Sequence, residues 1–243
     1  MDNFGFEQQE PRLVNPDVSG LNNFFKKVYT YMALALLVTA ATAYLGVTLF
    51  AVQIATIFSS PVSSLVMLAV MMGFVFLFSR QVFTNPGKAF GMLMGFSVLN
   101  GMTFAVIGLT TSLSMIASAF FTTALLFAGM AFYGVTTKKS LSSMSAILFG
   151  SVIALIIGGI INLFFFNSIV YFFLSVVGVI VFALMTAYDM NRLKAMYLEG
   201  GLQGDATLVQ GLAVSGALSL YMDFINLFLY ILRLFTAFGG SRD

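Results

Sequence analysis

Residues 216–233 read GALSLYMDFINLFLYILR, and this stretch decides the fold class of the chain. It is long enough to cross a bilayer, yet it carries Asp223 near its middle and Arg233 at its end. At about 100° per residue, one face of a helix would carry Gly216, Ser219, Asp223, Asn226, Tyr230 and Arg233. A helix with one polar stripe and apolar flanks is expected at the centre of a helix bundle. Because an ionisable group at membrane depth is costly, Asp223 is a candidate functional residue.

The composition indicates an integral membrane protein. Of the 243 residues, 60% are hydrophobic and only 8% are charged, whereas a soluble domain carries about 25% charged residues. The chain has no Cys and no His, which excludes disulfides, thiolate or histidine metal sites and Ser-His triads. The net charge is +2 and the basic residues never cluster beyond pairs, so we expect no nucleic-acid partner. No cofactor is expected either.

Charged residues separate three uncharged blocks, at 28–79, 89–137 and 140–188. Each block is about twice the ~20 residues of a spanning helix and therefore predicts a helical hairpin. With the stretch around Asp223, this gives an all-α, multi-pass fold of seven transmembrane helices, the last one central and wrapped by the other six. The expected spans are 28–50, 62–79, 89–109, 113–135, 143–164, 168–190 and 212–236. They form a domain at 23–238, with a flexible cytoplasmic tail at 1–22, a short tail at 239–243 and a long polar loop at 191–211.

The basic residues predict the orientation of the chain, because cytoplasmic loops are enriched in Lys and Arg. Nine of the 11 basic residues lie before or between the hairpins, and only Arg233 and Arg242 lie past the middle of the last span. This distribution places the N-terminus in the cytoplasm and, with seven spans, the C-terminus outside.

Three ionisable residues lie within or at the inner ends of the expected spans: Arg80, Asp189 and Asp223. The sixth and seventh spans are antiparallel neighbours, so the two aspartates can meet. Two carboxylates close together at low dielectric would share a proton and titrate as a pair, which is a pH switch without histidine. When ionised, Asp189 and Asp223 would offer oxygen ligands to a hard cation such as Ca²⁺, as a weak and transient site. Arg80 would latch the second helix to this pair.

Each of these residues also has a structural interpretation. Asp189 can be an interfacial residue paired with Arg192, and Asp223 can make a purely structural hydrogen bond. Arg80 can be an ordinary residue of the cytoplasmic side. In the polar stripe, Ser219, Asn226, Tyr230 and Arg233 are expected to support Asp223.

Residues 216–235 strongly resemble the last-helix motif of the Bax inhibitor-1 family, also called transmembrane Bax-inhibitor-motif proteins. The stretch TAYDMNRLK at 186–194 resembles the end of that family's sixth helix, and YGVTTKKSLS at 133–142 is similar to its fourth-loop motif. The chain is identified as a bacterial-type member along essentially its whole length. It departs at Ser140, where relatives commonly place an acid, and at the end of the third span, where a Gly-Pro is often found.

The resemblance implies a pH-sensitive Ca²⁺ leak rather than an enzyme, with Asp189 and Asp223 as the sensor and Arg80 as the latch. We expect a monomer in the inner membrane of a bacterium, with the lipid bilayer, protons and calcium ions as its partners. It also links bacterial relatives to a membrane protease partner. A non-transporting regulator that binds such a partner is therefore the alternative function.

An intramembrane aspartyl protease is the third function that two membrane aspartates suggest. One acid and one base on adjacent helices would activate water. However, the second motif of such proteases should read Gly-x-Gly-Asp within a helix, and Asp223 follows Leu220-Tyr221-Met222. The only Gly-Asp pair, at 204–205, lies in the polar loop, and a Pro-Ala-Leu element is absent.

Overall fold

The computed structural model describes residues 18–165, 167–199 and 205–239, and this part of the chain is almost entirely helical. The elements in chain order are α1 (Val18–Thr48), α2 (Ala51–Ser59), α3 (Pro61–Gln81), α4 (Pro86–Thr110), α5 (Leu113–Thr136), the 3₁₀ turn η1 (Ser142–Met144), α6 (Ser145–Phe165), α7 (Ser168–Glu199) and α8 (Ala206–Gly239). Together these residues form an all-α fold, as the sequence predicts.

Short polar side chains set where several helices begin. The Asn85 side chain accepts a hydrogen bond from the Lys88 amide, and Pro86 occupies the first helical position of α4. Asn167 accepts from two backbone amides at the start of α7. Asp205 does the same at the start of α8, where Thr207 and Leu208 donate to its carboxylate. Each side chain satisfies amides that lack a partner within the helix.

Six helices are long and apolar enough to cross a membrane, by length and composition: α1, α4, α5, α6, α7 and α8. The remaining predicted span, 62–79, corresponds to α3, which contains a shorter apolar stretch, Leu65–Gln81. The nine residues of α2 are too few to cross a bilayer. Side chains on the outer faces, such as Leu125, Phe164 and Phe165, are more than three-quarters exposed, as expected for a lipid-facing surface.

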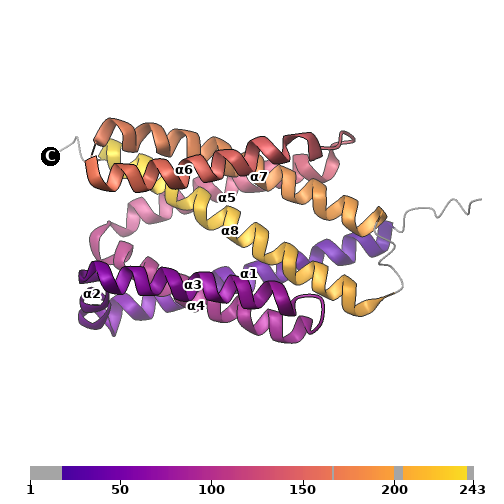
Figure 1. Ribbon diagram of the computed structural model, residues 1–243, viewed down its shortest axis with the longest axis horizontal. Helices are drawn as coiled ribbons and strands as arrows, with labels where there is room; N and C mark the ends of the chain where they lie inside the picture. Colours follow the sequence, from indigo (N-terminus) through magenta and orange to yellow (C-terminus); the bar gives the residue numbers. More distant parts are fainter. Residues whose placement is uncertain (1–17, 166, 200–204, 240–243) are drawn as a thin grey trace, which may run out of the picture.

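The last helix lies at the centre, which confirms the predicted arrangement. Within the apolar window of α8, 67% of the residues are buried, against at most 39% in any other candidate span. In Figure 1, α8 runs diagonally between a group formed by α5, α6 and α7 and a group formed by α1 to α4. Its direct neighbours are α1, α4, α5 and α7, whereas α3 packs mainly on α4, and α6 packs mainly on α7. The helices around α8 therefore form an inner layer with α3 and α6 outside it.

The predicted loop at 191–211 is mostly helical, so this prediction was wrong. α7 continues to Glu199, and α8 already begins at Ala206. The extension of α7 is stabilised by packing, since Leu193 and Tyr197 are buried and the Tyr197 ring stacks on Phe24 of α1 at 4.8 Å between centroids. Residues 200–204 lie outside the described part of the chain.

Two further boundaries differ from the prediction. The helix α2 was not expected, and it packs on α4 and on the neighbouring ends of α1 and α3, with Ile54 buried. The predicted tail at 1–22 overlaps the start of α1, which begins at Val18. The remainder of that tail, and residues 240–243 of the short C-terminal tail, lie outside the described residues.

Basic side chains gather at one end of the bundle. The start of α1, the α3–α4 turn, the α5–α6 connection and the end of α7 all lie at the same end in Figure 1, and the end of α8 lies at the other. The segments that lie at or lead to the first end carry Lys26, Lys27, Arg80, Lys88, Lys138, Lys139, Arg192 and Lys194. This clustering is what the positive-inside rule requires of a cytoplasmic face.

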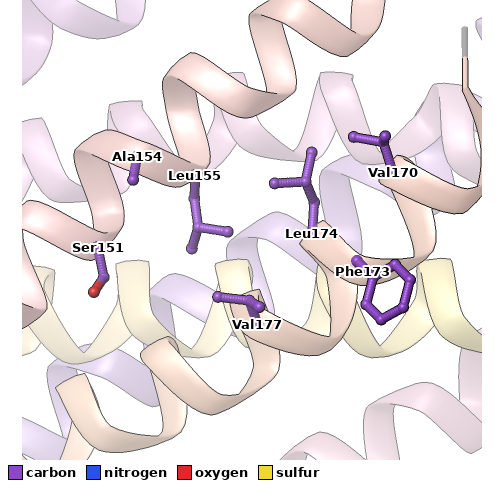
Figure 2. A pocket seen from close by; sticks show the side chains of 7 residues that line it. All are labelled: Ser151, Ala154, Leu155, Val170, Phe173, Leu174 and Val177. Carbon is purple, nitrogen blue, oxygen red and sulfur yellow. The ribbon is translucent and has the colours of Figure 1, made fainter.

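An apolar groove of about 320 Å³ separates parts of α6 and α7. Figure 2 shows side chains of both helices along it. The lining residues are Ser151, Ala154, Leu155, Val170, Phe173, Leu174 and Val177. The groove lies between two helices that can cross a membrane, and none of its lining residues is charged.

Candidate functional site

The polar stripe of α8 faces α7. Near its start, a Cβ added at Gly216 would come within 2.7 Å of the Leu193 side chain. Near its end, the Tyr230 ring stacks on Phe182 at 5.8 Å between centroids, and it lies so close to Gly178 that an added Cβ would be 2.5 Å away. Glycine at these two positions therefore allows the close approach of the two helices. The stripe is the surface along which α7 and α8 meet.

Asp189 of α7 and Asp223 of α8 meet in the middle of this surface. The Asp189 side chain is 7% exposed and that of Asp223 is 3% exposed. The two carboxyl groups lie close enough to interact electrostatically. Neither aspartate therefore lies in an exposed, interfacial position. Burial of two such groups is stable only when their charge is neutralised or compensated.

The two carboxyl groups have different surroundings. The hydroxyl of Ser219, one turn before Asp223 on α8, lies beside the Asp189 carboxylate. Arg192, one turn after Asp189 on α7, acts on the same carboxylate electrostatically. In contrast, the Oδ2 atom of Asp223 is buried without a hydrogen-bond partner in the described part of the chain. A buried oxygen without a partner costs about 1–3 kcal/mol, so it is a candidate position for a proton or a ligand.

The other stripe residues have separate roles. The Asn226 side chain donates to the Met222 carbonyl of its own helix. The Arg233 guanidinium lies over the rings of Tyr171 and Tyr230, at 5.4 and 5.1 Å from their centroids. Since Arg233 is ten residues from Asp223, about 15 Å along the helix, it stabilises the α7–α8 contact at a distance from the aspartates.

Arg80 does not approach the aspartate pair, which corrects the predicted latch. Its side chain is exposed, and its guanidinium lies over the Phe76 ring of α3 at 4.4 Å from the centroid. The turn that follows α3 packs on α8 at Gly211, where an added Cβ would be 2.5 Å from the Val82 carbonyl. Gly211 is twelve residues before Asp223, about 18 Å along the helix. The end of α3 therefore meets α8 at a point farther from Asp223 than an arginine side chain can reach.

The opposite face of α8 carries a buried polar cluster that the sequence analysis did not find. The Tyr221 and Thr39 hydroxyls lie 2.7 Å apart, and Thr39 Oγ1 also lies 3.0 Å from the Ala35 carbonyl and 3.1 Å from the Ser97 carbonyl. All three hydroxyl residues, Thr39, Ser97 and Tyr221, are at most 5% exposed. The cluster joins α8 to α1 and α4. Thr and Ser within spans commonly bond to their own helix, so their presence alone gave no signal.

The donor set limits what metal chemistry is possible. Among the described residues, no group of three or more His, Cys, Asp or Glu side chains could hold a metal ion. The aspartate pair offers two carboxylates, whereas Ca²⁺ prefers six to eight oxygen ligands. Asp189 and Asp223 alone are therefore too few ligands for a permanent Ca²⁺ site.

The bundle thus combines six helices long and apolar enough to cross a membrane, a central last helix and a buried aspartate pair. The family described as "Inhibitor of apoptosis-promoting Bax1" matches residues 21–240. The chain belongs to the Bax inhibitor-1 family. It is a multi-pass membrane protein.

Bacterial members of the Bax inhibitor-1 family resemble the chain over nearly its full length. YrjE of Lactococcus lactis is 34% identical over 225 residues, which cover 92% of this chain and 94% of YrjE. A protein of Borreliella burgdorferi is 35% identical, covering 91% of this chain and 93% of its own. YbhL of Escherichia coli K12, an inner membrane protein, is 32% identical and covers 89% and 92%.

Proposed function

We propose that this chain is a pH-sensitive leak for Ca²⁺ across a bacterial inner membrane, with its N-terminus in the cytoplasm. The observation that supports this proposal best is the unpaired, buried Oδ2 atom of Asp223 beside Asp189. A proton shared between the carboxyl groups relieves their repulsion and holds α7 against α8. Loss of that proton leaves two like charges, which favours separation of the helices and attraction of a cation.

Three further features support a moving α7–α8 contact. The contact is built along one polar stripe, and the absence of a side chain at Gly178 and Gly216 allows the two helices to approach closely. The rest of α8 is held by aromatic contacts to other helices, such as Phe224 against Phe120 and Phe127 of α5 at 5.6 and 5.4 Å. A fixed central helix beside a helix with a titratable contact is an arrangement that can have two states.

Calcium flux into proteoliposomes tests the proposal. We expect Ca²⁺ flux through the wild-type protein to be higher above neutral pH, where the aspartate pair loses its proton, than below neutral pH. Asparagine is a permanently neutral counterpart of the protonated carboxyl group, so Asp189→Asn and Asp223→Asn should each abolish most of this pH dependence. Asp205→Asn is the matched control, because Asp205 caps α8 outside the aspartate pair and Asn caps a helix equally well.

Two outcomes would contradict the proposal. If Asp189→Asn and Asp223→Asn both conduct with the wild-type pH dependence, the aspartate pair is not the sensor. If the wild-type protein conducts no Ca²⁺ at any pH, the alternative of a non-transporting regulator is favoured, and crosslinking of the wild type in native membranes should then capture a partner such as a membrane protease.

A further inference from the structure

A second pocket lies at the basic end of the bundle, outside the α7–α8 contact. It has a volume of about 390 Å³ and lies between the α5–α6 connection and the end of α7. Its polar side chains are Ser140, Ser142, Asn191 and Arg192. Tyr188, Ala195 and Met196 complete the wall. Arg192 is the charged residue in the lining, and it is exposed.

The pocket is held in shape by Asn191. Its Oδ1 atom accepts a hydrogen bond from the Leu141 amide at 3.0 Å, and its Nδ2 group donates to the carbonyls of Gly134 and Lys139, both at 3.3 Å. These contacts fix the α5–α6 connection to α7. The amide of Asn191 is thereby used within the protein. The Ser140 and Ser142 hydroxyls lie 2.9 Å apart and hydrogen-bond each other, so one of them keeps its proton for a ligand, together with the Arg192 guanidinium.

The charges around the pocket favour an anion. Lys138 and Lys139 belong to the connection that forms one wall, and both are exposed. The ammonium group of Lys194 donates to the Val135 carbonyl at 2.7 Å, so a fourth cation lies on the adjoining turn of α7. A planar guanidinium beside hydroxyl donors is a typical phosphate-binding set.

The apolar rim of the pocket favours a lipid phosphate over a free phosphate ion as the ligand. Immediately after η1, α6 presents Ile147 and Phe149, which are 70% and 46% exposed. Phe149 contacts the pocket residue Tyr188 edge-on at 6.2 Å between ring centroids. A phosphate in the pocket would therefore have a lipid-facing apolar surface beside it, along which acyl chains can lie.

We propose that the pocket formed by Ser140, Ser142 and Arg192 binds the phosphate of an anionic lipid headgroup at the cytoplasmic surface. Basic pockets between membrane helices on this side are suited to such headgroups. This binding does not depend on the proposed leak. Because Arg192 also acts on Asp189, an effect of the lipid on Ca²⁺ flux would follow only where the proposed function holds.

Native mass spectrometry of the full chain in detergent tests the proposal without any flux measurement. With phosphatidylglycerol and phosphatidylcholine offered in equal amounts, we expect the wild type to retain phosphatidylglycerol selectively. Arg192→Gln should weaken that retention about tenfold, which is the usual effect of losing a charge-assisted hydrogen-bonded contact. Arg192→Lys should fall between the two, because it keeps the charge but loses the planar fork. Arg80→Gln is the matched control, since it removes one exposed cation from the same end of the bundle.

Three results would overturn the proposal. One is equal retention of phosphatidylglycerol by the wild type and a helical, folded Arg192→Gln variant. Another is an equal loss of retention in Arg80→Gln, which would show that only the general positive charge matters. The third is complete displacement of phosphatidylglycerol by millimolar inorganic phosphate, with phosphate bound by the wild type and not by Arg192→Gln, which would make the free ion the ligand.

Discussion

Tyr221 is the residue through which the centre of the bundle is joined to its first half. Its hydroxyl lies 2.7 Å from that of Thr39, in a buried cluster with Ser97. Removing the hydroxyl in Tyr221→Phe leaves Thr39 without this partner, and we expect a loss of about 1 kcal/mol in the free energy of unfolding. For a chain of this length, that corresponds to a Tm lower by about 2–4 °C in detergent micelles.

Tyr44→Phe is the matched control for Tyr221→Phe. Tyr44 lies on the same helix as Thr39, but its side chain is 69% exposed. It makes the same chemical change without removing a buried contact, so its Tm should equal that of the wild type. Equal melting temperatures for the two variants would show that the Tyr221 hydroxyl contributes nothing to stability.

The contact between α7 and α8 is tested at Gly178. A methyl group in Gly178→Ala would come within 2.5 Å of Cγ and Cδ1 of Tyr230. These atoms lie at the base of the ring and cannot swing away, so the helices must separate. We expect a loss of about 1–3 kcal/mol, typical of overpacking, measured by thermal unfolding. Tyr230→Ala removes the ring. In a protein that carries Tyr230→Ala, the further change Gly178→Ala should therefore cost much less stability than it does in the wild type.

Gly150→Ala is the matched control for this element. Gly150 lies in α6, and a Cβ at this position would meet nothing within 4 Å. Because alanine is the better helix former, this variant should be as stable as the wild type or slightly more so. A Gly178→Ala variant as stable as Gly150→Ala would contradict the close α7–α8 contact.

The orientation of the whole molecule is a prediction from its basic end, and it is open to a direct test because the chain has no Cys. Thr84, before α4, and Ser112, after it, are exposed residues at opposite ends of that helix. If the basic end is cytoplasmic, a membrane-impermeant maleimide should label Ser112→Cys in intact cells. It should label Thr84→Cys only after the membrane is permeabilised. The opposite labelling pattern would reverse the predicted topology.

The residue pattern by itself determined the membrane class, the spanning helices and the pairing of Asp189 with Asp223. These features depend on hydrophobic runs, charge positions and one helical stripe, all of which are local in the sequence. The aspartates could be paired because α7 and α8 are consecutive antiparallel helices. Asp205 is a typical N-cap residue and caps α8, although the polar residues around it predict a loop.

Only the tertiary structure decided which non-consecutive helices meet and how each is rotated. It placed Arg80 over Phe76, away from the aspartates, and brought Tyr221 to Thr39 across 182 residues of chain. It also joined the α5–α6 connection to α7 through Asn191 and so formed the basic pocket. The physical reason is that lipid surrounds all outer faces equally, so hydrophobic pattern does not select neighbours. Side-chain packing and interhelical hydrogen bonds select them instead.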